Sequence, residues 1–302
     1  MSIFQDIRTA FDRRDNALNQ ILLLNVLVFA GLIIAHAVLK ISNAEGYYAP
    51  VLRQFELSSA GPVLARHPWT VLTYAFTHEG FFHILFNLLN LYWFGQLVRE
   101  YLGNRRLVSL YVLGALAGAA VFLLSYNFLP AFQPGLGTSV VGASAAVTAI
   151  IVAGATLLPD YTFMLILLGP VKIKWIALAV VLISLAGVNG GNPGGEITHL
   201  GGALLGFVFI KQLKAGRDLG RPVQAIGDWV GHLFQRRPAM RVSTTRRPEP
   251  VATAAPRGAR PAPAPGQPHP DEVDTILDKI SRSGYESLSK EEKQKLFRAS
   301  QQ

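Results

Sequence analysis

The chain has 302 residues, of which 50% are hydrophobic and only 16% are charged, and its mean hydropathy is +0.31. This hydropathy is high for a soluble protein and indicates several membrane spans. Cysteine is absent, which excludes disulfides and thiolate metal sites. The net charge of +9 is unevenly placed, because residues 211–270 hold eleven Lys/Arg against three Asp/Glu. The excess therefore belongs to a tail rather than to a folded basic surface, and we expect no nucleic-acid partner.

Apolar runs predict six membrane-spanning helices. Residues 1–20 form a polar segment, and the first run after them is too long for the apolar part of a cleaved signal peptide. The six predicted spans are 21–39, 82–98, 107–126, 140–158, 175–185 and 197–213. Three other segments are not expected to span. The aromatic-rich 40–80 suits the membrane interface. The apolar but short 161–171 is a surface or re-entrant segment, and the glycine-rich 187–196 is predicted to be a mobile lid.

The distribution of basic residues predicts the orientation in the membrane. With the N-terminus inside, the inner segments 1–20, 99–106 and 159–175 hold three, three and two Lys/Arg. The outer loops 127–139 and 187–197 hold none. We therefore expect a multi-pass protein of the inner cell membrane with both termini in the cytoplasm. The first residues of the fourth and sixth spans then lie towards the outer face.

The chain beyond the sixth span is predicted to be a linker followed by a small helical hairpin. Residues 214–270 are predicted to be a basic, proline-rich cytoplasmic linker, and its part 236–270 cannot bury a core. They can contact anionic lipid, although a solvated linker agrees with the sequence equally well. In 271–302, helical spacing of apolar residues ends at Gly284, and Ser289 and Glu292 form a capping box that starts a second helix. The predicted domains are thus 1–20, 21–213, 214–270 and 271–302, the last a docking element for a cytosolic partner.

Ser144 lies near the start of the fourth span among residues with very small side chains. Gly142 and Ala143 precede it and Ala145 follows, so another helix or a peptide backbone can approach closely. Helix packing alone could require such a run. An isolated serine in a membrane helix is usually structural, because its hydroxyl bonds to the carbonyl four residues earlier. By itself, Ser144 can be either a packing residue or a nucleophile.

His199 lies near the start of the sixth span, and Gly202 and Gly206 follow on the same helix face. This face favours close contact with another helix, so we expect the imidazole to lie against a protein partner rather than lipid. If the partner is the helix of Ser144, His199 can accept the hydroxyl proton. A hydrogen bond from the imidazole to a backbone carbonyl is the structural alternative.

His83 and Asn87 are four residues apart and therefore project from one face of the second span. They can bond an oxyanion formed at Ser144, or they can hold two helices together. The remaining polar candidates lack partners at useful spacing: His36, His67, His78 and Asn90. No metal-binding motif is present, so we expect neither a metal ion nor an organic cofactor.

Together these residues resemble the rhomboid intramembrane serine proteases over residues 68 to about 210. The matching stretches are Pro68-Trp69-Thr70-Val71-Leu72-Thr73, His83-x3-Asn87, Glu100-x2-Gly103, Gly142-Ala143-Ser144 and His199-x2-Gly202-x3-Gly206. The resemblance implies a six-helix core in which Ser144 and His199 form a catalytic dyad without an acidic third member. It also implies an oxyanion hole lined by His83, Asn87 and the Ser144 amide. A substrate's transmembrane segment would enter beside the fifth span and the 187–197 loop. The C-terminal hairpin resembles a cytosolic domain of some bacterial rhomboids.

Two residues depart from the family pattern. Ala145 stands where glycine is usual, and Thr148 stands where an aromatic residue commonly packs on the histidine. The added methyl group can shift the dyad, and the aromatic residue's support is lost. Neither change removes a group that the chemistry requires.

The sequence therefore predicts an all-α membrane protein with a six-helix rhomboid bundle and a short C-terminal helical hairpin. Its predicted activity is an intramembrane serine endopeptidase that cleaves transmembrane segments of membrane proteins. One alternative is a weakly active or inactive rhomboid-like protein that binds membrane clients. A small-solute transporter is a more distant one, because no inverted repeat is present.

Overall fold

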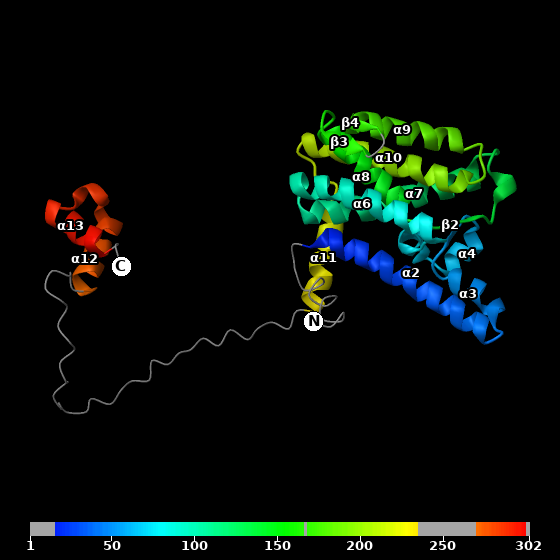
Figure 1. Ribbon diagram of the computed structural model, residues 1–302, viewed down its shortest axis with the longest axis horizontal. Coiled ribbons are helices and arrows are strands. Elements are labelled where there is room, and N and C mark those ends of the chain that lie inside the picture. The colour runs from blue at the N-terminus through cyan, green and yellow to red at the C-terminus, as the bar shows by residue number, and fades with distance from the viewer. Residues whose placement is uncertain (1–15, 166–167, 235–269, 300–302) are drawn as a thin grey trace, which may run out of the picture. The chain divides into compact units, whose positions relative to one another are not determined.

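The computed structural model describes residues 16–165, 168–234 and 270–299, which belong to two units divided after Arg237. Six long helices of the first unit run alongside one another (Figure 1). They are α2 (Ala17–Ile41), α6 (Phe81–Leu102), α7 (Asn104–Phe128), α8 (Ser144–Leu157), α9 (Ile173–Gly187) and α10 (Pro193–Lys214). Each of the six apolar runs corresponds to one of them. The predicted all-α bundle is confirmed, while the exact domain boundaries stay predictions.

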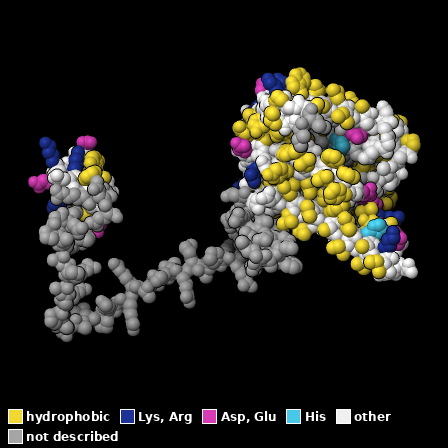
Figure 2. All heavy atoms as spheres, viewed as in Figure 1, with side chains coloured by type: hydrophobic (Ala, Val, Ile, Leu, Met, Phe, Trp, Pro, Cys, Tyr) yellow, Lys and Arg dark blue, Asp and Glu magenta, His cyan; other side chains and the backbone are white. Residues whose placement is uncertain are grey.

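The outer surface of this bundle is apolar. Helices α2, α6 and α7 are long and apolar enough to cross a membrane, and α8 and α9 are shorter apolar helices. Large hydrophobic side chains are exposed along the outer helices, among them Ile34 of α2, Phe86 of α6 and Ile183 of α9. Figure 2 shows such side chains over much of the visible face. A surface of this kind is stable in lipid, so the chain is a membrane protein.

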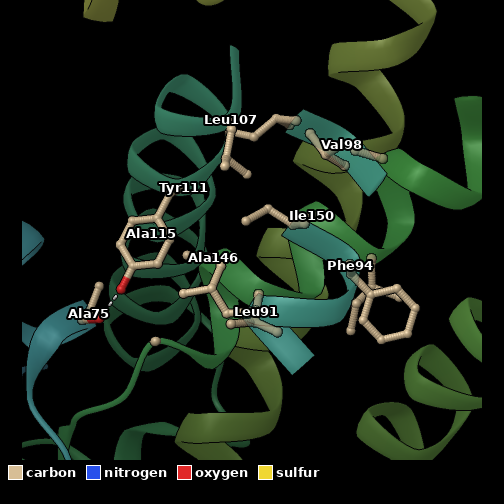
Figure 3. Packing of buried hydrophobic residues seen from close by; sticks show 14 of the residues in the cluster. Ala75, Leu91, Phe94, Val98, Leu107, Tyr111, Ala115, Ala146 and Ile150 are labelled. Carbon is tan, nitrogen blue, oxygen red and sulfur yellow. Dashed lines mark hydrogen bonds between the residues drawn. The ribbon is translucent and has the colours of Figure 1, made fainter. Parts of the chain in front are cut away.

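Helix α8 lies in the middle of the bundle, in contact with α6, α7, α9 and α10. Ten of its fourteen residues are buried. Figure 3 shows Ala146 and Ile150 of α8 beside Leu91 of α6 and Tyr111 of α7. A helix of this length measures about 21 Å, less than the roughly 30 Å hydrocarbon core of a bilayer. It is tolerated because protein rather than lipid surrounds its ends.

The prediction that the fourth span begins at residue 140 is wrong. Ser139 and Val140 form strand β2, which pairs antiparallel with β1 (Leu57–Ser58), and the helix starts only at Ser144. Gly142, with φ of +125°, interrupts the apolar run. Similarly, α10 starts at Pro193, inside the predicted glycine-rich loop, because Asn192 caps it by accepting a hydrogen bond from the Gly195 amide at 3.0 Å.

The long 40–80 connection contains short helical pieces and strand β1. They are η1 (Glu45–Tyr47), α3 (Tyr48–Leu52), α4 (Gly61–Arg66), α5 (Thr70–Thr73) and η2 (Tyr74–Phe76); a further turn, η3 (Gln133–Gly135), follows α7. Two buried tyrosines fix the connection to α7. Tyr74 donates to the carbonyl of Ala115, and Tyr111 donates to the carbonyl of Ala75, both at 2.7 Å.

The apolar segment 161–171 forms a β-hairpin in its described part. Strands β3 (Thr162–Leu165) and β4 (Gly169–Lys172) pair antiparallel between α8 and α9. At its base, Lys172 and Lys174 contact Asp160 at 3.0 and 2.8 Å. These two ammonium groups, Lys174 first, lower the pKa of Asp160 to about 2.

The predicted linker 214–270 is wrong for its first part, since α11 (Arg221–Phe234) is a helix. It packs against α7 and crosses the direction of the bundle helices (Figure 1). Arg105 pairs with Asp228, and Arg106 pairs with Asp218 at 2.9 Å. Half of the residues of α11 are apolar, and Val223, Ile226 and Val230 follow helical spacing. Residues 235–269 of the predicted linker lie outside the described residues.

The second unit contains α12 (Pro270–Ser283), η4 (Tyr285–Ser287) and α13 (Lys290–Ala299). The capping box forms as predicted: the Ser289 amide donates to the Glu292 carboxylate at 2.7 Å, and the Glu292 amide donates to Ser289 Oγ at 3.3 Å. Gly284, with φ of +77°, follows the last residue of α12. Lys279 joins the two helices through Glu292 at 2.9 Å. The predicted C-terminal helical hairpin is confirmed.

Candidate active site

A glycine turn places Ser144 at the first position of α8. The turn is held by the Gly142 amide, which donates to the carbonyl of Tyr74 at 2.9 Å. A Cβ atom on Gly142 would lie 2.7 Å from Nε2 of His83, so no larger residue fits without movement. The first amides of a helix have no acceptor within it. The Ser144 hydroxyl therefore lies beside backbone amides of the first turn of α8 that have no acceptor within the helix.

The backbones of α8 and α10 are in direct contact at two glycines. A Cβ atom on Gly202 would lie 2.8 Å from the carbonyl carbon of Ala145, and one on Gly206 would lie 3.0 Å from that of Ala149. Cβ atoms in proteins are essentially never found closer than 3.0 Å to such neighbours. His199 precedes Gly202 by one turn on the same helix face. The contact therefore brings the start of α10 to the start of α8.

Ser144 and His199 line one cavity of about 400 Å³ together with His83 and Asn87. The wall also contains two aromatic side chains, three polar or glycine residues and a valine: Phe82, Phe86, Asn90, Asn192, Gly195 and Val141. Phe82 and Phe86 are largely exposed, so the cavity opens beside an apolar surface. A hydroxyl, two imidazoles and an amide thus converge in a space that can admit an extended peptide segment.

Asn87 is buried, and its side-chain amide donates to the carbonyl of His83 at 3.0 Å. A side-chain amide carries two N–H bonds, so this contact engages only one of them. His83 makes an edge-on contact with the ring of His78, with centroids 5.0 Å apart. His78 in turn accepts a hydrogen bond from the Ala143 amide at Nε2, at 3.3 Å. His78 thus links Ala143, the residue before Ser144, to His83, one of the predicted oxyanion residues.

The imidazole of His199 has two polar neighbours at Nδ1. Ser184 of α9 places Oγ at 3.0 Å, and Glu196 of α10 places Oε2 at 3.2 Å. The expected dyad stays a prediction, and the structure adds an acidic neighbour to its histidine. The fold brings a carboxylate to the histidine, because Glu196 is three residues before His199 on the same helix.

Residues 65–214 match the family model of the rhomboid domain. The chain belongs to the rhomboid family. The C-terminal residues 268–302 match a second model, a family of unknown function (DUF6576).

Curated relatives of this rhomboid protein come from Arabidopsis thaliana. RHOMBOID-like protein 12, mitochondrial, is 30% identical over 158 residues, which cover 49% of this chain and 47% of the relative. Rhomboid-like protein 16, chloroplastic, is 29% identical over 160 residues, which cover 49% of this chain and 50% of the relative. The chain thus spans about half the length of the curated relatives it matches.

The structure brings the four predicted catalytic residues of this rhomboid protein to one cavity, although their roles stay predictions. Sequence reasoning missed two residues that the fold adds beside His199: Ser184 and Glu196. Glu196 could have been found from its helical spacing to His199. Ser184 comes from another helix, so no local signal indicated it. Two residues without a partner at useful spacing in the sequence also lie at the site: Asn90 lines the cavity, and His78 contacts the ring of His83.

His36 and His67 lie outside this cavity. His36 contacts Glu45 at 3.4 Å, and His67 contacts Gln54 at 3.1 Å. Within the described residues, no group of three or more His, Cys, Asp or Glu side chains is placed to hold a metal ion.

Proposed function

We propose that this rhomboid protein is an intramembrane serine endopeptidase that cleaves transmembrane segments of membrane proteins. The observation that carries the proposal is the cavity shared by Ser144, His199, His83 and Asn87 at the start of α8. Hydrolysis of a peptide bond requires a nucleophile, a base and donors for the oxyanion, and these four residues provide all three. Membership of the rhomboid family agrees with this chemistry.

In the proposed mechanism, Ser144 Oγ attacks the carbonyl carbon of the scissile peptide bond while His199 takes the hydroxyl proton. The carbonyl π electrons move to the oxygen, which becomes an oxyanion. Asn87, His83 and the Ser144 amide donate hydrogen bonds to it. When the intermediate collapses, the C–N bond breaks and His199 gives its proton to the leaving amine. Water then hydrolyses the acyl-enzyme, with His199 again acting as base.

The substrates we propose are single-span membrane proteins whose helices unwind near small or helix-breaking residues. An unwound segment has unpaired backbone groups, which are costly in lipid and favourable in a polar cavity. The exposed rings of Phe82 and Phe86 would support the apolar part of such a segment. We propose the inner cell membrane as the location, with both termini in the cytoplasm and Ser144 towards the outer face. The basic residues at the opposite ends of α6, α7 and α10 support this orientation.

The proposal is tested with the full chain in liposomes, using a serine-directed fluorophosphonate and a single-span reporter protein. We expect labelling and cleavage by the wild type, and neither in Ser144→Ala or His199→Ala. Ser125→Ala is the matched control, because Ser125 is a serine of the membrane helix α7 that does not line the cavity. Asn87→Ala should lower kcat by about 10²–10³-fold, as loss of an oxyanion donor does.

Two results would contradict this function. If the wild type labels no better than Ser144→Ala, Ser144 is not a nucleophile. If the wild type also binds the reporter without cutting it, the protein binds membrane proteins and does not cleave them. Ala145 and Thr148, the two departures from the family pattern, would then account for the lost activity.

A further inference from the structure

We propose that Glu196 is a positioning residue for His199, and that Ser184 assists it, so that a carboxylate orients the imidazole of the Ser144–His199 dyad. This inference rests on the proposed protease function and adds a carboxylate to it. The observation behind it is the pair of contacts at Nδ1 of His199, to Glu196 Oε2 at 3.2 Å and Ser184 Oγ at 3.0 Å.

The first consequence concerns the tautomer of His199. A carboxylate can only accept hydrogen bonds, so the nitrogen beside it must carry the hydrogen. Nδ1–H then donates to Glu196, and the lone pair is left on Nε2. The Ser184 hydroxyl can share this hydrogen as a second acceptor. Nε2 is thus kept as the atom that accepts the proton of Ser144.

The second consequence concerns charge. When His199 takes the proton of Ser144, a cation forms in a partly water-excluded cavity. A carboxylate 3.2 Å away stabilises that imidazolium. Both side chains are about three quarters buried, with 23% and 22% of their surface exposed. Solvent therefore screens their interaction less than it would screen a surface pair.

The fold holds Glu196 in this position from two sides. Glu196 is in the first turn of α10, where the helix dipole favours a negative charge. Across from it is Gly187, the last residue of α9, where a Cβ atom would lie 2.8 Å from Cδ of Glu196. Only a glycine lets the end of α9 close over the carboxylate in this way. Glu196 is therefore packed between α9 and the imidazole.

The stability of α10 does not require the Glu196 carboxylate. Asn192 already caps α10 through its side chain, so the helix does not depend on Glu196 for its first turn. Within the described residues, the ion pair of Glu196 is with His199, and none with Lys or Arg is found. A carboxylate near the apolar phase is costly without a partner. The imidazole is the partner that makes its burial acceptable.

The experiment uses the full chain in liposomes with the single-span reporter, and compares Glu196→Gln, Glu196→Asp and Ser184→Ala with the wild type. Glu196→Gln keeps the size and removes the charge. We expect it to lower kcat by roughly 10²–10⁴-fold and to leave KM within about threefold, as loss of a triad carboxylate does. Glu196→Asp should recover at least about tenfold of this loss, since the charge is restored. Ser184→Ala should have a smaller effect, about 3–10-fold.

The matched control is Glu45→Gln, because Glu45 is also in contact with a histidine, His36, at 3.4 Å but outside the cavity. It should keep wild-type kcat and thermal stability. The inference is overturned if Glu196→Gln keeps kcat within about threefold of the wild type. It is also overturned if the thermal midpoint falls and Glu196→Asp recovers neither activity nor stability, which would mean a structural role.

A second measurement does not depend on activity. NMR spectra of ¹⁵N-histidine-labelled protein report which nitrogen of His199 carries the hydrogen. We expect Nδ1–H in the wild type and in Ser144→Ala, and a mixture of tautomers in Glu196→Gln. Equal spectra in Glu196→Gln and wild type would overturn the inference. If instead the wild type shows this tautomer but cleaves nothing, the protease function fails while the positioning by Glu196 stands.

Discussion

The contact between α8 and α10 makes Gly202→Ala a sharp test of the site. The added Cβ would lie 2.8 Å from the carbonyl carbon of Ala145 and closer still to its oxygen, whereas ordinary contact begins at 3.4 Å. The two helices must therefore separate by at least the difference, 0.6 Å. Gly206 makes the same contact one turn further along, so α10 cannot simply tilt away. Overpacking of this kind costs about 1–3 kcal/mol of stability.

The larger effect should be on activity. His199 is one turn from Gly202, so the displacement of α10 is transmitted to the imidazole. A shift of about 1 Å in a reacting group costs on the order of 100-fold in rate. We therefore expect Gly202→Ala to lower the rate of fluorophosphonate labelling and of reporter cleavage about 100-fold, while the protein still folds in detergent.

Gly31→Ala is the matched control for this variant. Gly31 is also in a membrane helix, α2, but a Cβ there would meet nothing within 4 Å. This substitution should preserve activity and add up to about 1 kcal/mol of stability through helix propensity. If Gly202→Ala labels and cleaves within about twofold of Gly31→Ala, the helices do not position the dyad in the way described.

Two further predictions concern Tyr111, which is buried in the bundle, and Asp160, at the base of the β3–β4 hairpin. Tyr111→Phe removes a buried donor to a backbone carbonyl. It should lower the free energy of unfolding, measured with denaturant in detergent, by about 1–3 kcal/mol. The control Tyr92→Phe, at an exposed position, should change this free energy little, and equal effects of the two variants would contradict the reasoning. Asp160 should titrate with a midpoint of about 2 by NMR, because Lys174 and Lys172 favour its ionised form. Its folded pKa is lowered, so its contribution to stability is present above the ordinary value of 3.8 and is lost as the pH falls through about 2. In the double variant Lys172→Ala, Lys174→Ala the midpoint should return towards 3.8; an unchanged midpoint would refute the assigned cause.

The six bundle helices could be predicted from the sequence because each of them contains an apolar run. Their ends could not always be predicted, since hydropathy reports composition and not backbone conformation. Val140 and Val141 extend the apolar run of α8, yet Gly142 breaks the helix with a positive φ. Helix α11 has a helical spacing of apolar residues, but it lies at the start of a chain segment that is otherwise basic and proline-rich, and its contact with α7 is tertiary.

The site was predictable where its residues follow helix spacing. His83 with Asn87, and His199 with Gly202, lie on single helix faces, so the sequence alone groups them. The meeting of these faces at one cavity depends on how the helices pack. Ser184 is fifteen residues from His199 in the sequence, and only the crossing of α9 and α10 brings it to Nδ1. Such a contact carries no local signal.

The short length of α9 has a consequence for the surrounding membrane. Its fifteen residues span about 22 Å, and much of its surface is exposed, including Trp175, Leu178 and Ile183. A lipid-facing element shorter than the roughly 30 Å hydrocarbon core creates a hydrophobic mismatch, which bilayers relieve by thinning locally. For the proposed substrates, a transmembrane helix of ordinary length beside α9 would then be too long for the bilayer there. The excess would extend to the interface, where backbone groups can exchange helical hydrogen bonds for bonds to water.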